Sequence, residues 1–190
     1  MNNDILNHFI RRFQLLSLPE TPLGRQIKQA AVLIPIIRKE QPSILLTRRS
    51  RTLRHHPGQV AFPGGAVDIS DVSLSATALR EACEEIGLEP KNVDVLGQLP
   101  SQDSISGYRV TPIIGLLPDG LHFRQNRDEV DALFEVPLTH ILRIQNYRTI
   151  NVFRRGQGHD IYVMPYKGHL IWGLTAAILR QLAIQETFSR

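Results

Sequence analysis

The sequence predicts an α/β fold: an α/β/α sandwich in which helices cover both faces of a mixed β-sheet. Short apolar runs rich in β-branched residues recur along the chain. One internal segment places its apolar residues at helical spacing between two groups of these runs, and the last segment does so again. Strands interrupted by one helix and followed by another pack most simply as a sheet with a helix on each face.

Length and composition restrict the organisation of the chain. Its 190 residues suit one domain with a helical extension. We expect an N-terminal amphipathic helix and linker at residues 1–24 and the main domain at residues 25–190. No apolar run reaches the length of a membrane span, and the first residues lack a secretory pattern. The sequence therefore predicts a soluble, cytoplasmic protein.

Cysteine count and charge exclude some classes of function. One cysteine excludes an internal disulfide framework and a multi-cysteine metal site. The net charge of +4 and pI of about 9.6 suit an anionic partner, but the charge is modest and spread along the chain. A membrane partner is not expected, and a nucleic acid partner is possible but not indicated by a charge of this size.

The N-terminal helix is predicted from apolar residues at helical spacing, with Arg11 and Arg12 on its polar side. It would pack on the domain or on a second subunit, so a homodimer is one expected arrangement. The linker is indicated by Pro19, Pro22 and Gly24. The apolar residues of the helix are Ile5, Phe9, Ile10, Phe13 and Leu16.

The main domain is predicted to contain strands on both sides of its internal helix. Pro35 within the first strand predicts an edge position or a bulge. The loop at residues 100–107 is polar and could line a substrate pocket. A last helix would pack through Ile171, Leu174, Ile178 and Leu182. The expected strands are Ala30–Arg38, Ser43–Arg49 paired with it, Val93–Leu99, Tyr108–Leu117, and a hairpin of Tyr147–Phe153 with His159–Met164.

The internal helix carries three glutamates within five residues. Glu81 and Glu85 are four residues apart and Glu84 is three from Glu81, so all three carboxylates share one turn. Gly87 is the expected left-handed end of the helix. The opposite, apolar stripe would face the core and makes Cys83 a small core residue. This stripe consists of Ala78, Leu79, Ala82, Cys83 and Ile86.

Two interpretations of this helix are open. Carboxylate oxygens are the ligands that Mg²⁺ or Mn²⁺ selects, so the helix could hold a divalent cation. It could also be a solvated acidic face, with an Arg80–Glu84 ion pair of a few tenths of a kcal/mol. For a Glu-Glu pair alone the second interpretation is favoured.

The order of the surrounding residues favours the first. The segment resembles the box of the Nudix hydrolases, G-x5-E-x7-R-E-U-x-E-E-x-G-U, where U is a bulky apolar residue. Its second half is met by the run from Arg80 to Leu88, and its first glycine is Gly65. The first half departs from the pattern, because Asp71 stands in place of Glu and the spacer before Arg80 is one residue longer. In the second half, Ala82 is small for a U position.

A second resemblance concerns the cationic stretch before the box. Arginines in such a stretch are usually solvated, although beside a metal-binding helix they could grip phosphates. Residues 45–65, LLTRRSRTLRHHPGQVAFPGG, look like the signature LLT-x-R-[SA]-x3-R-x3-G-x3-FPGG of the coenzyme A pyrophosphatase branch. The match includes Arg49, Arg54, Gly58 and the Phe62–Gly65 run.

The resemblance implies the Nudix fold and metal-dependent hydrolysis of a phosphoric anhydride, with Mg²⁺ or Mn²⁺ as the cofactor. It implies that Glu81 and Glu85 bind metal, that Glu84 is a third ligand or the base, and that Arg80 positions a glutamate. Arg49, Arg54, Gly64 and Gly65 would bind the substrate. A carboxylate from a late loop often joins such sites, and Glu129 is the candidate here.

Three functions therefore remain open from the sequence. The signature implies cleavage of coenzyme A, or a derivative, to 3′,5′-ADP and 4′-phosphopantetheine. The same chemistry could act on ADP-ribose or a dinucleotide. A non-catalytic Nudix-like module could bind RNA or another ligand, although such modules often lose box carboxylates and all three are present here.

Overall fold

The fold is built on one mixed sheet. The structure, a computed structural model, describes residues 2–16, 23, 28–154 and 156–187. Within this part of the chain, eight strands form a sheet with the central order β3-β2-β1-β7-β5; β4 also pairs with β1, β6 with β7 and β8 with β2. The strands are β1 Gln29–Arg38, β2 Ser43–Arg49, β3 Val60–Ala61, β4 Gly64–Ala66, β5 Asp94–Gln98, β6 Gln102–Asp103, β7 Arg109–Pro118 and β8 Val130–Pro137.

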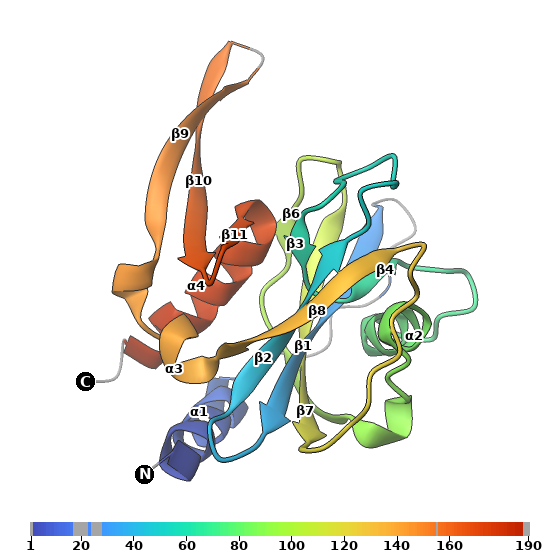
Figure 1. Ribbon diagram of the computed structural model, residues 1–190, viewed down its shortest axis with the longest axis vertical. Helices are drawn as coiled ribbons and strands as arrows, with labels where there is room; N and C mark the ends of the chain where they lie inside the picture. The colour runs from blue at the N-terminus through green and yellow to red at the C-terminus, as the bar shows by residue number, and fades with distance from the viewer. Residues whose placement is uncertain (1, 17–22, 24–27, 155, 188–190) are drawn as a thin grey trace.

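Helices and a second, smaller sheet surround this core (Figure 1). The smaller sheet has the order β11-β10-β9, and its β9–β10 hairpin extends beyond the body of the molecule (Figure 1). Its strands are β9 Arg148–Arg154, β10 Gln157–Tyr166 and β11 His169–Trp172. The helices are α1 Asn2–Leu16, α2 Leu74–Ile86, α3 Leu138–Ile141 and α4 Gly173–Thr187, with 3₁₀ turns η1 Pro90–Asn92 and η2 Ile144–Asn146.

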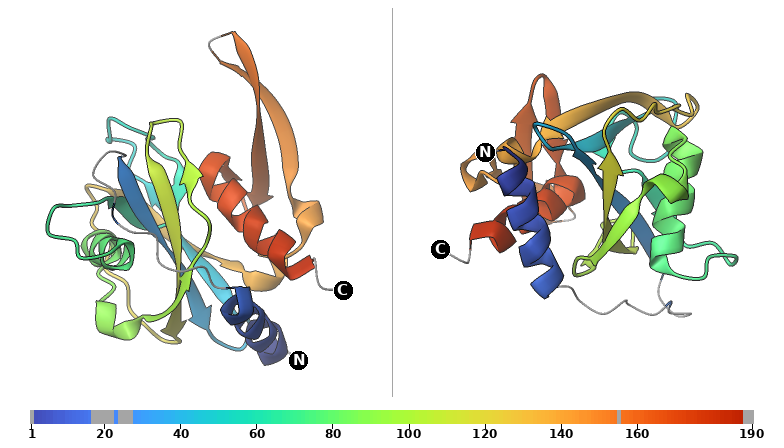
Figure 2. Two further views of the ribbon diagram at one scale, coloured as in Figure 1. Left: turned by 180° about the vertical axis from the view of Figure 1, so that it is seen from behind. Right: turned by 90° about the horizontal axis from the view of Figure 1, so that it is seen from below.

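Both faces of the main sheet are buried. Successive side chains of a strand point to opposite faces, so one strand contributes to the apolar clusters on both sides. In β1, Leu33 and Ile37 join the apolar cluster beneath α2, whereas Ile34 and Ile36 join the cluster that includes α1 and α4. Figure 2 shows α2 on one side of the sheet and α1 and α4 on the other. The predicted α/β/α sandwich with a mixed sheet is confirmed.

Helix α1 packs on its own domain. Leu6, Phe9 and Phe13 are at most 4% exposed and join the cluster around α4. The rings of Phe9 and Phe13 stack with centroids 6.2 Å apart. The apolar stripe of α1 thus packs against the core of the same chain. The expected linker residues Pro19, Pro22 and Gly24 lie outside the described residues.

The prediction that Pro35 marks an edge strand is wrong. Strand β1 is central: it pairs in parallel with β7 along its whole length and antiparallel with β4 and β2. The registered pairs with β4 end at Val32 and those with β2 begin at Ile36. Pro35 falls between these two partners, where the missing N–H breaks no ladder bond on that side. A central strand tolerates the proline because its neighbour changes there.

Other predicted elements differ at their ends or in kind. The β2 pairing with β1 and the β9–β10 hairpin are confirmed. Residues 130–137, which follow the late-loop candidate Glu129, form strand β8 along β2, where no strand was predicted from the sequence. Ile171 lies in strand β11 and not on the last helix, which begins at Gly173. Ile178 and Leu182 are buried on α4 as expected.

Candidate active site

Helix α2 has a defined beginning and end, which fixes the direction of its carboxylates. The Ser73 hydroxyl accepts a hydrogen bond from the Ala76 N–H at 3.1 Å, the usual role of an N-cap residue. Gly87 ends the helix in the left-handed region with φ of 67°, as predicted. Between these caps the helix lies on β1 and β4, so its inner side faces the glycine turn.

The three glutamates of α2 lie in three different environments. The Glu85 side chain is 5% exposed, that of Glu81 17% and that of Glu84 55%. Glu85 therefore occupies the buried side of the helix, whereas Cys83 is exposed. The prediction that Cys83 is a core residue is wrong, because the helix turns Glu85 towards the sheet and Cys83 away from it.

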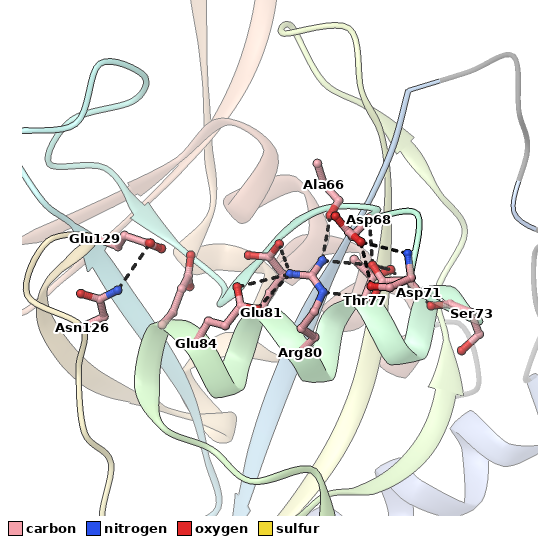
Figure 3. Close-up of polar contacts among 12 residues, drawn as sticks. Ala66, Asp68, Asp71, Ser73, Thr77, Arg80, Glu81, Glu84, Asn126 and Glu129 are labelled. Atoms are coloured by element: carbon pink, nitrogen blue, oxygen red, sulfur yellow. Dashed lines mark hydrogen bonds and ion pairs between the residues drawn. The ribbon is translucent and has the colours of Figure 1, made fainter.

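Arg80 joins the helix to the loop before it (Figure 3). Its guanidinium donates to both Asp71 oxygens at 3.0 Å, to Glu81 Oε1 at 2.9 Å and to Glu84 at 3.3 Å. It also donates to the Ala66 carbonyl at 3.1 Å. A planar fork of N–H donors suits this two-sided arrangement. Arg80 thereby fixes the Glu81 carboxylate relative to the loop.

Asp71 is the residue that departs from the expected box glutamate, and it closes the loop onto the helix. Besides Arg80 it accepts from the Thr77 hydroxyl at 2.8 Å and from the Asp68 N–H at 2.8 Å. The Arg80 hydrogen bonds, helped by those from Asp68 and Thr77, lower the pKa of Asp71 to about 2 against the cost of burial. The shorter aspartate thus serves as the partner of Arg80 across a loop that is one residue longer.

The two glycines of the turn are required by close approaches. A Cβ on Gly65 would come within 2.4 Å of the Glu81 carboxyl carbon. Gly64 has φ of 155°, and a Cβ there would meet β1 at 2.5 Å. The missing side chains therefore let β4 lie against β1 on one side and admit the Glu81 carboxylate on the other.

Glu85 is a buried carboxylate with little compensation. Burial raises the pKa of Glu85 to about 8, and the nearby negative charges of Glu81 and Glu129 add to this shift. The positive charge of Arg49 and the hydrogen bond from the Gly64 N–H oppose it. The ion pair with Arg49 is long, with 3.9 Å between Nη1 and Oε1. Burial likewise raises the pKa of Glu81. The site collects more negative charge than its arginines offset.

These oxygen donors fit a hard divalent cation such as Mg²⁺ or Mn²⁺, not a sulfur-ligated metal. Among the described residues, no three acidic, histidine or cysteine side chains are already gathered as a metal-binding group. The fit rests on the raised pKa values of Glu81 and Glu85, whose ionised forms a bound cation would stabilise, and on the missing side chain at Gly65 beside the Glu81 carboxylate.

Comparison with known proteins identifies the family. The NUDIX domain family matches residues 27–154. The chain belongs to the Nudix family. It is 51% identical over 180 residues to the uncharacterized Nudix hydrolase NudL of Salmonella newport (strain SL254), covering 95% of this chain and 94% of that protein. The NudL of Citrobacter koseri is 48% identical over the same shares.

Solved structures support the Nudix fold. The NUDIX domain of Shewanella oneidensis NrtR complexed with ADP ribose has a TM-score of 0.52 and 16% identity, covering 90% of this chain and 95% of that one. The M. smegmatis Nudix hydrolase RenU has a TM-score of 0.50 and 26% identity, covering 59% and 71%. The predicted family is confirmed. Among the described residues, no helix is long and apolar enough to cross a membrane.

The remaining predicted site residues of this Nudix hydrolase differ in their placement. Arg49 reaches Glu85, as described above. Arg54 is exposed in the loop between β2 and β3 and makes no contact with the carboxylates among the described residues. Glu129, the late-loop candidate, is partly buried, and its charge contributes to the raised pKa of Glu81 and of Glu85, after burial as the main cause.

Two polar residues at the site were missed by sequence reasoning. Thr77 is fully buried under Asp71 and lies on the inner side of α2. Asn126 bonds to the Glu129 side chain at 3.4 Å (Figure 3). Both bonds are local in sequence, six and three residues apart, but the sequence patterns considered above concern mainly glutamates, glycines and arginines and specify neither Thr77 nor Asn126.

Proposed function

We propose that this Nudix hydrolase is a metal-dependent pyrophosphatase that cleaves the diphosphate of coenzyme A or its derivatives, giving 3′,5′-ADP and 4′-phosphopantetheine. The observation that carries the proposal lies within residues 45–65, which match the coenzyme A signature. Near one end of this segment Arg49 lies 3.9 Å from Glu85, and at the other Gly65 leaves room for the Glu81 carboxylate. Signature and carboxylates thus share one site.

The carboxylates would hold the cofactor, with Glu81 and Glu85 as ligands and Glu84 as a third ligand or the base. A bound Mg²⁺ or Mn²⁺ supplies charge to neutralise phosphate oxygens and lowers the pKa of a water. Glu84 is the most exposed of the three, which suits a group that accepts a proton from water and passes it to solvent. Hydrolysis forms a bond between the water oxygen and one phosphorus and breaks the bond between that phosphorus and the bridging oxygen.

The arginines would have separate tasks. Arg80 uses its donors on Asp71, Glu81 and Ala66, so it holds the carboxylate and does not bind the substrate. Arg49 retains a buried Nε without a partner among the described residues and could donate to a phosphate oxygen. Arg54, being exposed, would meet a phosphate at the outer end of the substrate.

The direct test is incubation of the protein with coenzyme A and Mn²⁺, followed by chromatography for the two products. ADP-ribose is offered in parallel under the same conditions. The E85Q variant, purified identically, controls for contaminating hydrolases. We expect coenzyme A to be cleaved at the higher kcat/KM and E85Q to be nearly inactive.

The contrary outcomes separate the alternatives. Faster cleavage of ADP-ribose with coenzyme A left intact would favour the other nucleotide substrate. Folded protein that cleaves neither compound, but binds RNA with a salt-dependent affinity, would favour the binding module. A cytoplasmic location and a homodimer stay predictions; fractionation of the source cells and light scattering on the purified protein would test them.

A further inference from the structure

Asn126 lies where the segment between β7 and β8 runs beside the end of α2. Its N–H donates to the Glu85 carbonyl at 2.8 Å, and the Arg124 N–H donates to the Ile86 carbonyl at 2.9 Å. A helix leaves its last carbonyls without partners inside the helix, so these two bonds satisfy groups at its C-terminal turn. The segment is thereby attached to the residue that carries the most buried glutamate.

The same asparagine organises the turn that carries Glu129. The Asn126 carbonyl accepts from the N–H groups of Glu129 at 3.0 Å and Val130 at 2.8 Å. Its side-chain oxygen accepts from the Asp128 N–H at 3.2 Å, a common turn arrangement for asparagine. A turn-forming role needs only these bonds and would be satisfied by aspartate as well.

One bond goes beyond turn formation. The Asn126 amide Nδ2 donates to Glu129 Oε1 at 3.4 Å. Figure 3 shows the Glu129 carboxylate at the Asn126 end of the carboxylate row on α2. The Glu129 carbonyl also accepts from the Ser50 N–H at 2.8 Å, next to Arg49. Backbone and side chain of Glu129 are thus both held, and Asn126 contacts both.

We propose that Asn126 is a positioning residue, whose amide group holds the Glu129 carboxylate beside Glu81 and Glu85 as part of the cation-binding site. The inference rests on the proposed function. A neutral amide is suited to this task because it donates to one carboxylate oxygen without offsetting the charge that a cation needs. The second oxygen of Glu129 remains available to the site.

The test is the N126D variant. Aspartate has nearly the same shape and keeps the acceptor for the Asp128 N–H, but it replaces the donor with a negative charge facing Glu129. Groups that orient metal ligands typically change affinity or activity by about 10–100-fold. We therefore expect Mn²⁺ affinity, measured by paramagnetic resonance titration, and kcat to fall by about tenfold or more. KM for coenzyme A and the thermal midpoint should change little.

A double-mutant cycle shows whether Asn126 acts through Glu129. In the E129Q background the glutamine side chain no longer depends on the donor, so N126D should have almost no further effect. The D128N variant removes an exposed charge from the same turn and keeps its backbone N–H, so it should behave like wild type. Equal effects of N126D with and without E129Q would overturn the proposal and leave Asn126 as a turn former.

The two proposals fail separately. If wild type binds Mn²⁺ but does not cleave coenzyme A, the substrate proposal fails, and the Mn²⁺ affinities of the four proteins in the cycle still decide the role of Asn126. Wild-type affinity in N126D would overturn the positioning role even if coenzyme A is cleaved. Wild type that binds no Mn²⁺ overturns both.

Discussion

Helices α2 and α4 lie on opposite faces of the same sheet, yet their buried sides are chemically different. The buried side of α4 includes Ile178, Leu179 and Leu182, which are at most 1% exposed. The buried side of α2 includes Thr77 and Glu85 among its apolar residues. An apolar residue at position 85 would add to the core, whereas a buried carboxylate costs free energy. Helix α4 thus contributes apolar burial alone, whereas α2 carries the carboxylates of the proposed site at the expense of stability.

The largest expected effect on activity comes from replacing the buried carboxylate of α2, Glu85, by an amide. Glu85→Gln keeps the shape but not the ligand, so kcat should fall by about a thousandfold, or about 4 kcal/mol in activation free energy. Without metal the variant should be more stable than wild type at neutral pH by on the order of 1 kcal/mol or more, because Glu85, with its pKa raised to about 8, must take up a proton when the chain folds and glutamine need not. Kinetics with Mn²⁺ and thermal unfolding in a chelator measure both.

Glu89→Gln is the matched control for Glu85→Gln, since Glu89 is exposed and lies just beyond the helix. It should change neither quantity appreciably. Wild-type turnover by Glu85→Gln at saturating Mg²⁺ would reject the assignment of Glu85 as a metal ligand.

On α4, shortening a buried side chain should lower the stability of the protein and leave its activity unchanged. Leu179→Ala removes a fully buried side chain and should cost about 2–5 kcal/mol of unfolding free energy. Activity per folded molecule should stay at the wild-type level, measured well below the lowered thermal midpoint. Ile178→Val, which deletes one methylene, should cost about 0.5–1.5 kcal/mol. Loss of kcat in the folded Leu179→Ala protein would contradict the division between the two helices.

A smaller effect is expected from the contact that closes the α2 loop. The pKa of Asp71 is about 2 in the folded protein, against an ordinary value of 3.8. Ionised Asp71 therefore stabilises the fold fully above pH 3.8, and this stabilisation is lost as the pH falls through 2. Asp71→Asn should cost about 2 kcal/mol at neutral pH. Urea unfolding from pH 7 to 2 should show the two proteins converging in acid. A constant difference would show that charge is not the source.

The smallest effect is expected at the exposed side of α2. Cys83→Ser should change the unfolding free energy by less than about 0.5 kcal/mol, because Cys83 is exposed. The wild-type thiol should react with a disulfide reagent such as dithionitrobenzoate without denaturant. Reaction only after unfolding would restore the core interpretation of Cys83.

Positions 83 and 85 of α2 show how much of the site could be predicted from the sequence. The end of α2 at Gly87 and its glutamate cluster follow from local patterns, whereas its start and its N-cap Ser73 were not predicted. The helical stripe puts Cys83 inside and Glu85 outside, and the structure reverses them. Hydrophobic patterning fails there because a carboxylate occupies a buried position, as is expected where a proposed functional residue overrides the local pattern. Strand β8 was missed because its charged residues Asp131 and Glu135 find partners on Arg48 and Lys39, far away in sequence. Asn126 has its side-chain partner Glu129 only three residues away, and the distant contact that ties it to the site is its backbone bond to Glu85.

The parallel pairing of β1 with β7 has a consequence for how the protein folds. Residues 29–38 meet residues 109–118, and the chain that connects them includes β2, β4 and all of α2. Contacts between such distant segments form slowly, since a long loop must close before they gain free energy. Helix α2, which carries the proposed site, can form early, but its carboxylates acquire their surroundings only when this crossover closes. Recovery of activity during refolding should therefore lag behind recovery of helical signal.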